Sequence, residues 1–202
     1  MLEHSSRLGV DPQPVGPLGL IAMDGCKPLG EKVNEYLVRW EKEPENADQV
    51  LLTYPGYQRD SFLLDADCPR FSSGEGKAVL RQSVRGYDLY ILCDVTNYSN
   101  TYRMYGMEVP MSPDDYFQDL KRIIAAEGKK AKRVSVIMPY LYEGRQHRRS
   151  TRESLDCAMA LQELTSLGID NIITFDAHDP RVMNAIPLGG FDNFMPTYQF
   201  LK

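Results

Sequence analysis

Four short apolar runs, each followed by a helix-like segment, constrain the fold of this chain more than any other feature. The runs occupy residues 18–23, 88–95, 133–140 and 171–178. Runs that are apolar throughout are typical of strands buried on both faces of a sheet. Because strands that alternate with helices pair in parallel, the pattern predicts an α/β fold with a three-layer, mostly parallel sheet covered on both sides.

The segments after these runs show the spacing of amphipathic helices. Ser112 and Gly128 have the residue types of a helix N-cap and a helix stop. Ser150 and Glu153 match the S-x-x-E capping box and predict the start of the next helix, which Gly168 ends. The apolar stripes are Val33, Tyr36, Leu37 and Trp40, then Phe117, Leu120 and Ile124, then Cys157, Ala160, Leu161 and Leu164.

Two stretches depart from this alternation. Residues 1–17 are rich in proline and glycine and are expected to form a loose arm before a single domain at 18–202. Between the first helix and Asp88, two or three β-like runs predict a β-hairpin or flap added to the sheet.

Composition excludes several classes of protein. A formal net charge of −5 argues against a general nucleic-acid binder, and the apolar runs are too short to cross a membrane. The N-terminus lacks the apolar core of a secretory signal. The four cysteines form no C-x-x-C pair, which favours buried free thiols of a reducing cytoplasm over a zinc site.

Positive charge is concentrated in the stretch 144–154, which lies between a predicted buried strand and a predicted helix. Ligands of open α/β sheets bind beyond the carboxyl ends of the strands, and guanidinium groups pair with phosphate. The stretch therefore predicts a phosphate site, and the alternative is a solvated basic loop paired with carboxylates. The arginines concerned are Arg145, Arg148, Arg149 and Arg152.

A second polar cluster follows the last apolar run in the sequence FDAHD. Strand alternation would place Asp176 and His178 on one side, where a carboxylate and an imidazole suit a divalent metal such as Mg²⁺. The alternative is a histidine satisfied at a strand end, with Asp179 capping a short helix that begins at Pro180. Neither a G-x-x-x-x-G-K-[ST] loop nor a G-x-G-x-x-G loop is present.

Four segments together resemble the N-terminal half of ribose-phosphate pyrophosphokinase. They are FSSGEGKAVLRQSVRGYDLYIL, VIMPYLYEGRQHRRSTRES, NIITFDAHD and AIPLGGFDNF, in the order of the family. The resemblance implies a phosphoribosyltransferase-like fold with two such domains per full subunit, and a homo-oligomer, usually a hexamer. It also implies Mg²⁺-dependent transfer of the diphosphoryl group of ATP to ribose 5-phosphate.

The resemblance also implies roles for particular residues. The F-x-D-G-E stretch of the family holds the adenine nucleotide of a neighbouring subunit, and the R-Q pair holds nucleotide as well. The implied ATP-binding residues are Phe71, Ser73, Gly74, Glu75, Arg145, Gln146 and His147. His178, with Asp176, is implied at the metal, and Ser83 and Arg85 match a regulatory phosphate site.

Several positions depart from the family pattern. Ser73 and His147 stand where the family has aspartates, Ala177 replaces a leucine, and the connection 98–111 is longer. These departures leave open a non-catalytic regulatory relative that binds nucleotide or assembles with an active subunit. The ribose-phosphate loop and the catalytic residues belong to the second half of the family's chain. The sequence is therefore expected to be a piece without turnover of its own.

Overall fold

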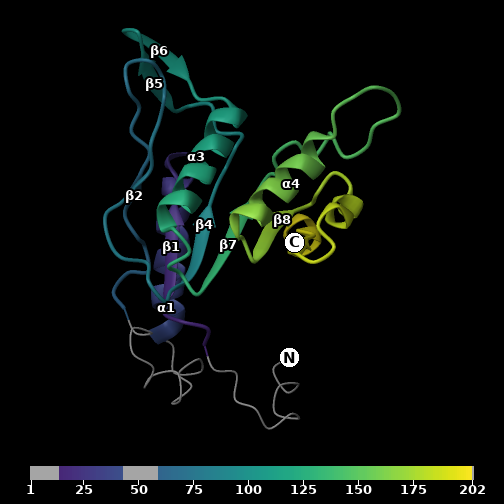
Figure 1. Cartoon of the computed structure of the whole chain (residues 1–202). Coiled ribbons are helices and arrows are strands. Elements are labelled where there is room, and N and C mark those ends of the chain that lie inside the picture. The colour runs from purple at the N-terminus through teal and green to yellow at the C-terminus, as the bar shows by residue number, and fades with distance from the viewer. Residues whose placement is uncertain (1–13, 43–58, 202) are drawn as a thin grey trace, which may run out of the picture.

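The structure is a computed structural model that describes residues 14–42 and 59–201. At its centre is a five-stranded sheet in the order β1-β4-β7-β8-β9, with every neighbouring pair parallel (Figure 1). The four predicted strands are confirmed, and β9 is an addition. The bounds are β1 Leu18–Ala22, β4 Asp88–Leu92, β7 Arg133–Met138, β8 Asn171–Phe175 and β9 Gly190–Phe194.

Helices join these strands in chain order. Figure 1 shows α3 and α4 side by side over the sheet. Buried side chains of both helices share one core with Leu89, Ile91 and Val136 of the strands, whereas Val33 of α1 packs on Leu20 and Leu92 of the other face. The bounds are η1 Asp24–Cys26, α1 Lys27–Lys42, α3 Pro113–Glu127, α4 Asp156–Leu167, η2 Pro180–Ala185 and α5 Thr197–Leu201. The three-layer, mostly parallel α/β prediction is thus confirmed.

The face of the sheet that α1 contacts is unevenly covered. Register places Ile137 opposite both Leu92 and Ile173, so these three side chains share that face. Leu92 is buried, Ile137 and Ile173 are half-buried, and Phe175 further along is exposed. Exposure on this face therefore increases away from α1.

The buried apolar face of α1 contains fewer residues than the sequence predicts. Val33 and Leu37 are half-buried, but Tyr36 and Trp40 are 56% and 50% exposed. The helix itself is confirmed. Its apolar spacing marked the correct face without showing that the far end of that face reaches the surface.

Two small hairpins extend the domain. β2 (Ala66–Asp67) pairs antiparallel with β3 (Val79–Leu80), which gives the predicted flap, although residues 43–58 of that region lie outside the described residues. β5 (Thr101–Met104) pairs antiparallel with β6 (Met107–Pro110) in a hairpin, where the sequence predicts only a long connection. Most of the predicted N-terminal arm, residues 1–13, also lies outside the described residues.

One helix start was predicted correctly and one was wrong. α3 has the expected N-cap, since the Ser112 side chain and Asp115 exchange hydrogen bonds with each other's backbone, and Gly128 ends it with a positive φ. α4 begins only at Asp156, without a side-chain cap at Leu155. The Ser150–Glu153 pair closes a local bend instead, with Ser150 N 3.2 Å from Glu153 Oε2. An S-x-x-E sequence can therefore form its local hydrogen bond in a bend as well as at the start of a helix.

Candidate functional site

A cleft of about 340 Å³ lies where β7 and β8 end. This is the edge of the sheet at which parallel α/β proteins bind ligands. The cleft brings together the two loops that the sequence singled out, and Arg145, Asp176 and His178 all line it. The other lining residues are Tyr140, Leu141, Gly144, Phe175 and Ala177.

The backbone after β8 turns sharply at the cleft. Asp176 has a φ of 48°, so the extended strand has already ended and strand alternation does not decide where its side chain points. The turn is held by β9: Asp176 N donates to Phe194 O at 2.9 Å, and Ala177 N donates to Asn193 Oδ1 at 2.9 Å. Asp176 and His178 do line one cleft, but the alternation argument for it was wrong.

His147 connects the two loops. Its Nδ1 lies 3.1 Å from the Arg145 carbonyl oxygen, and its Nε2 lies 3.5 Å from Asp179 Oδ2. The centres of the His147 and His178 rings are 5.2 Å apart, with the planes tilted by 55°. The position where the resemblance expects an aspartate thus places an imidazole beside His178.

Asp179 has the capping role expected from the sequence. Its Oδ1 accepts a hydrogen bond from Arg181 N at 2.9 Å at the start of η2, and the Arg181 side chain donates to both carboxylate oxygens. These hydrogen bonds hold the pKa of Asp179 well below its ordinary value. A carboxylate that is ionised at neutral pH therefore faces His147.

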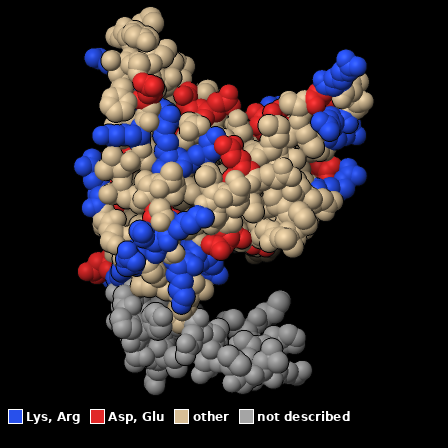
Figure 2. All heavy atoms as spheres, viewed as in Figure 1, with Lys and Arg blue, Asp and Glu red and all other residues tan. Residues whose placement is uncertain are grey.

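The arginines of the cleft loop are exposed and lack carboxylate partners among the described residues. Figure 2 shows basic side chains gathered on the loop between β7 and α4. This counts against the alternative in which these arginines only pair with surface carboxylates. The α4 start at Asp156 also places Arg152 before the helix and not in its first turn.

The loop that contains Phe71 lies elsewhere. Phe71 N donates to Glu75 O at 2.7 Å, Gly74 has a φ of 92°, and Ser73 Oγ donates to Glu75 Oε2 at 2.9 Å. Tyr105 N at the tip of the β5–β6 hairpin donates to Ser72 O at 2.8 Å. In Figure 1 this hairpin and the β7–α4 loop stand apart at the same end of the sheet. Within one chain, therefore, the Phe71 loop does not contribute to the cleft.

Ser83 and Arg85 occupy the turn before β4, at the opposite end of the sheet from the cleft. Arg85 N lies 3.3 Å from Ser83 Oγ, and Gly86 N donates to Lys130 O at 2.9 Å. Both side chains are exposed, as are Lys130 and Lys132. Figure 2 shows a second group of basic side chains at this lower end of the molecule.

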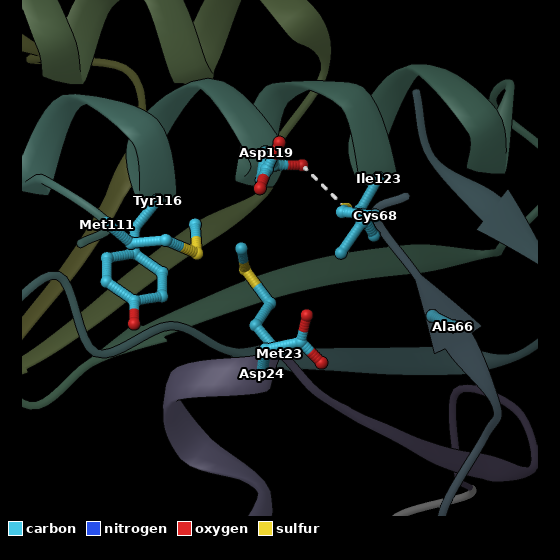
Figure 3. Close-up of a pocket in the computed structure, with 8 residues that line it drawn as sticks. All are labelled: Met23, Asp24, Ala66, Cys68, Met111, Tyr116, Asp119 and Ile123. Carbon is cyan, nitrogen blue, oxygen red and sulfur yellow. Dashed lines mark hydrogen bonds between the residues drawn. The ribbon is translucent and has the colours of Figure 1, made fainter. Parts of the chain in front are cut away.

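A smaller cavity beneath α3 is not a candidate site. Its volume is about 10 Å³, room for about one water molecule. Figure 3 shows the sulfur atoms of Met23 and Met111 and the side chain of Asp119 around it, and Cys68 Sγ lies 3.9 Å from Asp119 O. All four cysteines are free thiols. Burial raises the pKa of Cys26 and Cys68 to about 12, which keeps both protonated.

No group of three or more histidine, cysteine, aspartate or glutamate side chains among the described residues is arranged to hold a metal ion. Asp176 and His178 nevertheless offer one carboxylate and one imidazole to the cleft. Mg²⁺ typically uses one or two protein carboxylates and takes its other ligands from water and substrate phosphates. The cleft residues fit an Mg²⁺ ion that takes most of its ligands from water or phosphate oxygens.

A family profile for the N-terminal domain of ribose phosphate pyrophosphokinase matches residues 18–168. The chain belongs to this family. The ribose-phosphate pyrophosphokinase 1 of Schizosaccharomyces pombe is 32% identical over 115 residues, which are 56% of this chain and 25% of that protein. The ribose-phosphate pyrophosphokinase of Chromobacterium violaceum is 30% identical over 148 residues, which are 71% of this chain and 40% of that protein.

A solved structure also shares the fold. The phosphoribosylpyrophosphate synthetase from Mycobacterium smegmatis superposes with a TM-score of 0.68 at 19% identity, covering 91% of this chain and 50% of that one. The chain thus spans about half of the length of these relatives or less. Across the described residues, every helix is too short or too polar to span a membrane.

The sequence did not reveal every residue around the cleft. Tyr140 lines the cleft just after β7, but in the sequence an aromatic residue at the end of an apolar run is interpreted as part of the strand. The contact of His147 with Asp179 and His178 had no sequence signal at all. Only the pairing of β7 with β8 brings these loops together.

Proposed function

We propose that this chain is the N-terminal half of a ribose-phosphate diphosphokinase. The full enzyme would transfer the diphosphoryl group of ATP to the C1 hydroxyl of ribose 5-phosphate, giving phosphoribosyl pyrophosphate and AMP. The observation that carries the proposal is the cleft, which joins the cationic Arg145 to Asp176 and His178. A guanidinium group beside potential metal ligands suits the triphosphate of Mg²⁺-ATP.

We assign roles by position. Arg145, Gln146 and His147 would contact the nucleotide from the β7–α4 loop. Asp176 and His178 would hold the Mg²⁺ that the phosphates carry. The exposed Phe71 ring would stack on the adenine of a neighbouring copy, aided by Ser73, Gly74 and Glu75, which explains why this loop stands away from the cleft of its own chain. Groups that act on the ribose would come from the second half of the enzyme.

The proposal extends to assembly and location. A site shared between copies requires a homo-oligomer, and a hexamer is the form that the resemblance implies. Four free thiols suit a reducing cytoplasm. Ser83 and Arg85, at the far end of the sheet, would bind a regulatory phosphate. We assign neither nucleic acid nor membrane as a partner.

Two measurements test this function. Calorimetry with Mg²⁺-ATP should show binding that Arg145→Ala weakens about tenfold or more, because one charged phosphate contact is lost. Arg152→Ala, in the same loop but away from the cleft lining, is the matched control. Ribose 5-phosphate-dependent AMP release should be absent from this chain alone and present in the two-domain protein. AMP at background from the two-domain protein would refute the enzyme.

A second function is supported by one specific contact. The Ser73 hydroxyl donates a hydrogen bond to Glu75 Oε2 at 2.9 Å. This bond leaves the Glu75 carboxylate with fewer free lone pairs to accept from a nucleotide amino group. A non-catalytic regulatory relative that assembles with an active subunit would tolerate this. Oligomer formation without Mg²⁺-ATP binding would favour this regulatory function over the enzyme.

A further inference from the structure

We propose that His147 and His178 together form a two-imidazole site for a borderline transition-metal ion such as Ni²⁺, Zn²⁺ or Co²⁺. The site deepens the metal part of the proposed function, because it changes the class of metal that this cleft prefers. The remaining coordination positions would be filled by water or by phosphate oxygens. The proposal uses two protein ligands, in keeping with the absence of any larger donor cluster among the described residues.

The first argument is the spacing of the rings. An imidazole nitrogen bound at about 2.1 Å places the metal about 3.2 Å from the ring centre. Two imidazoles on one ion at a roughly tetrahedral angle then have centres about 5 Å apart. The centres of His147 and His178 are 5.2 Å apart. The 55° tilt between the planes also differs from a parallel stack, in which the nitrogens would not converge.

The second argument is the tautomer of His147. A carbonyl oxygen only accepts hydrogen bonds, so Nδ1, 3.1 Å from Arg145 O, carries the proton. In the neutral ring Nε2 then has a lone pair, and it faces the Asp179 carboxylate at 3.5 Å. Two acceptors at this distance repel each other unless a cation or a proton lies between them. A backbone carbonyl that fixes one ring nitrogen while the other is left for a metal is the usual support of a histidine ligand.

The third argument concerns the surroundings. The Asp176 carboxylate lines the cleft with His178 and offers a negative charge to an incoming cation, whereas the charge of Asp179 is already paired with Arg181 and the cationic Arg145 lines the same cleft. The His147 side chain is 15% exposed and His178 is exposed, so water can reach the remaining coordination positions. Imidazole suits zinc, nickel and copper, whereas Mg²⁺ prefers oxygen ligands. Two imidazoles in one place therefore shift the preference toward the transition metals.

The test is metal binding without nucleotide. The chain has three histidines, and His4, outside the described residues, is the only other imidazole. A tag-free His4→Ala chain is therefore the reference, titrated with NiCl₂ by calorimetry after EDTA treatment. We expect one Ni²⁺ per chain. His147→Ala and His178→Ala should each weaken binding by about tenfold or more, and the double variant should lose little beyond either single one.

A ligand swap tests the metal class. His147→Asp keeps a potential ligand but exchanges nitrogen for oxygen, so the ratio of Ni²⁺ to Mg²⁺ affinity should fall. Unchanged Ni²⁺ binding in both alanine variants, or losses that add independently in the double variant, would overturn the shared site. Loss of inorganic phosphate binding in His147→Ala without any loss of Ni²⁺ would overturn it in favour of an anion site.

One measurement needs no variant at the site itself. Electron paramagnetic resonance of the His4→Ala chain with one equivalent of Cu²⁺ should show coupling to two imidazole nitrogens. A spectrum with one nitrogen or none contradicts the proposal even if the alanine variants do not fold. Because these readouts contain no ATP, failure of the metal site and failure of the proposed enzyme are distinguishable.

Discussion

Arg70 Nη2 lies 2.7 Å from Asp119 Oδ2, and the two side chains are only 8% and 4% exposed. The same carboxylate accepts a hydrogen bond from Arg122 Nη1 at 2.5 Å, and the Arg70 guanidinium lies 4.9 Å from the centre of the Tyr102 ring. Arg70 immediately precedes the Phe71 loop. Arg70 therefore links that loop to α3 through the ion pair and to the β5–β6 hairpin through the Tyr102 ring.

We predict that Asp119→Asn lowers the free energy of unfolding by about 3 kcal/mol, because it leaves the buried Arg70 charge with only the more distant Asp115 carboxylate, 3.8 Å away. Urea denaturation measures the change. The exposed pair of Arg81 with Asp67 is the control, and Asp67→Asn should cause no measurable change. Equal losses of unfolding free energy for the two substitutions would mean that burial does not increase the contribution of the Arg70–Asp119 ion pair to stability.

Ser112 and Ser150, which both have the sequence signature of a helix cap, should differ in the same experiment. Ser112 Oγ accepts a hydrogen bond from Asp115 N at 3.1 Å at the start of α3. Ser112→Ala should therefore cost about 1 kcal/mol of unfolding free energy. Ser150→Ala should be neutral, because Ser150 lies in the loop before α4. A comparable loss at Ser150 would mean that its hydroxyl makes a stabilising contact, because the hydrogen bond of the bend is donated by the backbone N–H that Ser150→Ala keeps.

The sequence predicted those parts of the fold whose patterns are local. Continuous apolar runs marked β1, β4, β7 and β8, but β9 contains Gly190, Asp192 and Asn193, which are poor strand formers. Its pairing with β8 depends on a tertiary contact and gives no local signal. The β5–β6 hairpin has a partial signal in the sequence, because Gly106 suits the second position of its two-residue turn. In the structure, Tyr105 and Gly106 both have positive φ, as in a type I′ turn.

The same distinction holds for the candidate site. The rule that ligands bind beyond the carboxyl ends of parallel strands located both cleft loops from the sequence. The side chains that meet in the cleft are determined by backbone turns, such as the positive φ of Asp176. The periodicity of the sequence does not predict these turns. The contact between the His147 and His178 rings follows from two irregular loops on adjacent strands. Long-range contacts of this kind appear only once the sheet order is known.

The third prediction concerns the core under α4. Leu164 is fully buried, so Leu164→Ala should remove transfer free energy and leave a cavity, at a cost of about 2 to 5 kcal/mol. Met159 on the same helix is 60% exposed, and Met159→Ala should change the unfolding free energy little. Thermal or urea unfolding of the two variants tests the assignment of the helix faces. The reverse ranking would mean that α4 is rotated from the orientation described.

The last prediction is a pH dependence that arises from a buried thiol. Burial, with a smaller effect from the Asp94 carboxylate, raises the pKa of Cys26 to about 12 in the folded chain, against an ordinary value of 9.0. Between these values the unfolded chain loses the thiol proton and the folded chain keeps it. The contribution of Cys26 to stability is therefore complete below pH 9 and declines as the pH rises.

Urea denaturation at pH 8 and pH 10 should show this decline in the difference between the parent chain and Cys26→Ala. The cavity left by Cys26→Ala is the same at both pH values, so it cancels in the comparison. The parent should lose about 1 kcal/mol relative to the variant over this interval. Other groups that titrate in the range affect both proteins alike. A constant difference would mean that the Cys26 thiol ionises equally in the folded and unfolded chains. That result would contradict the burial of Cys26, which is 1% exposed in the core.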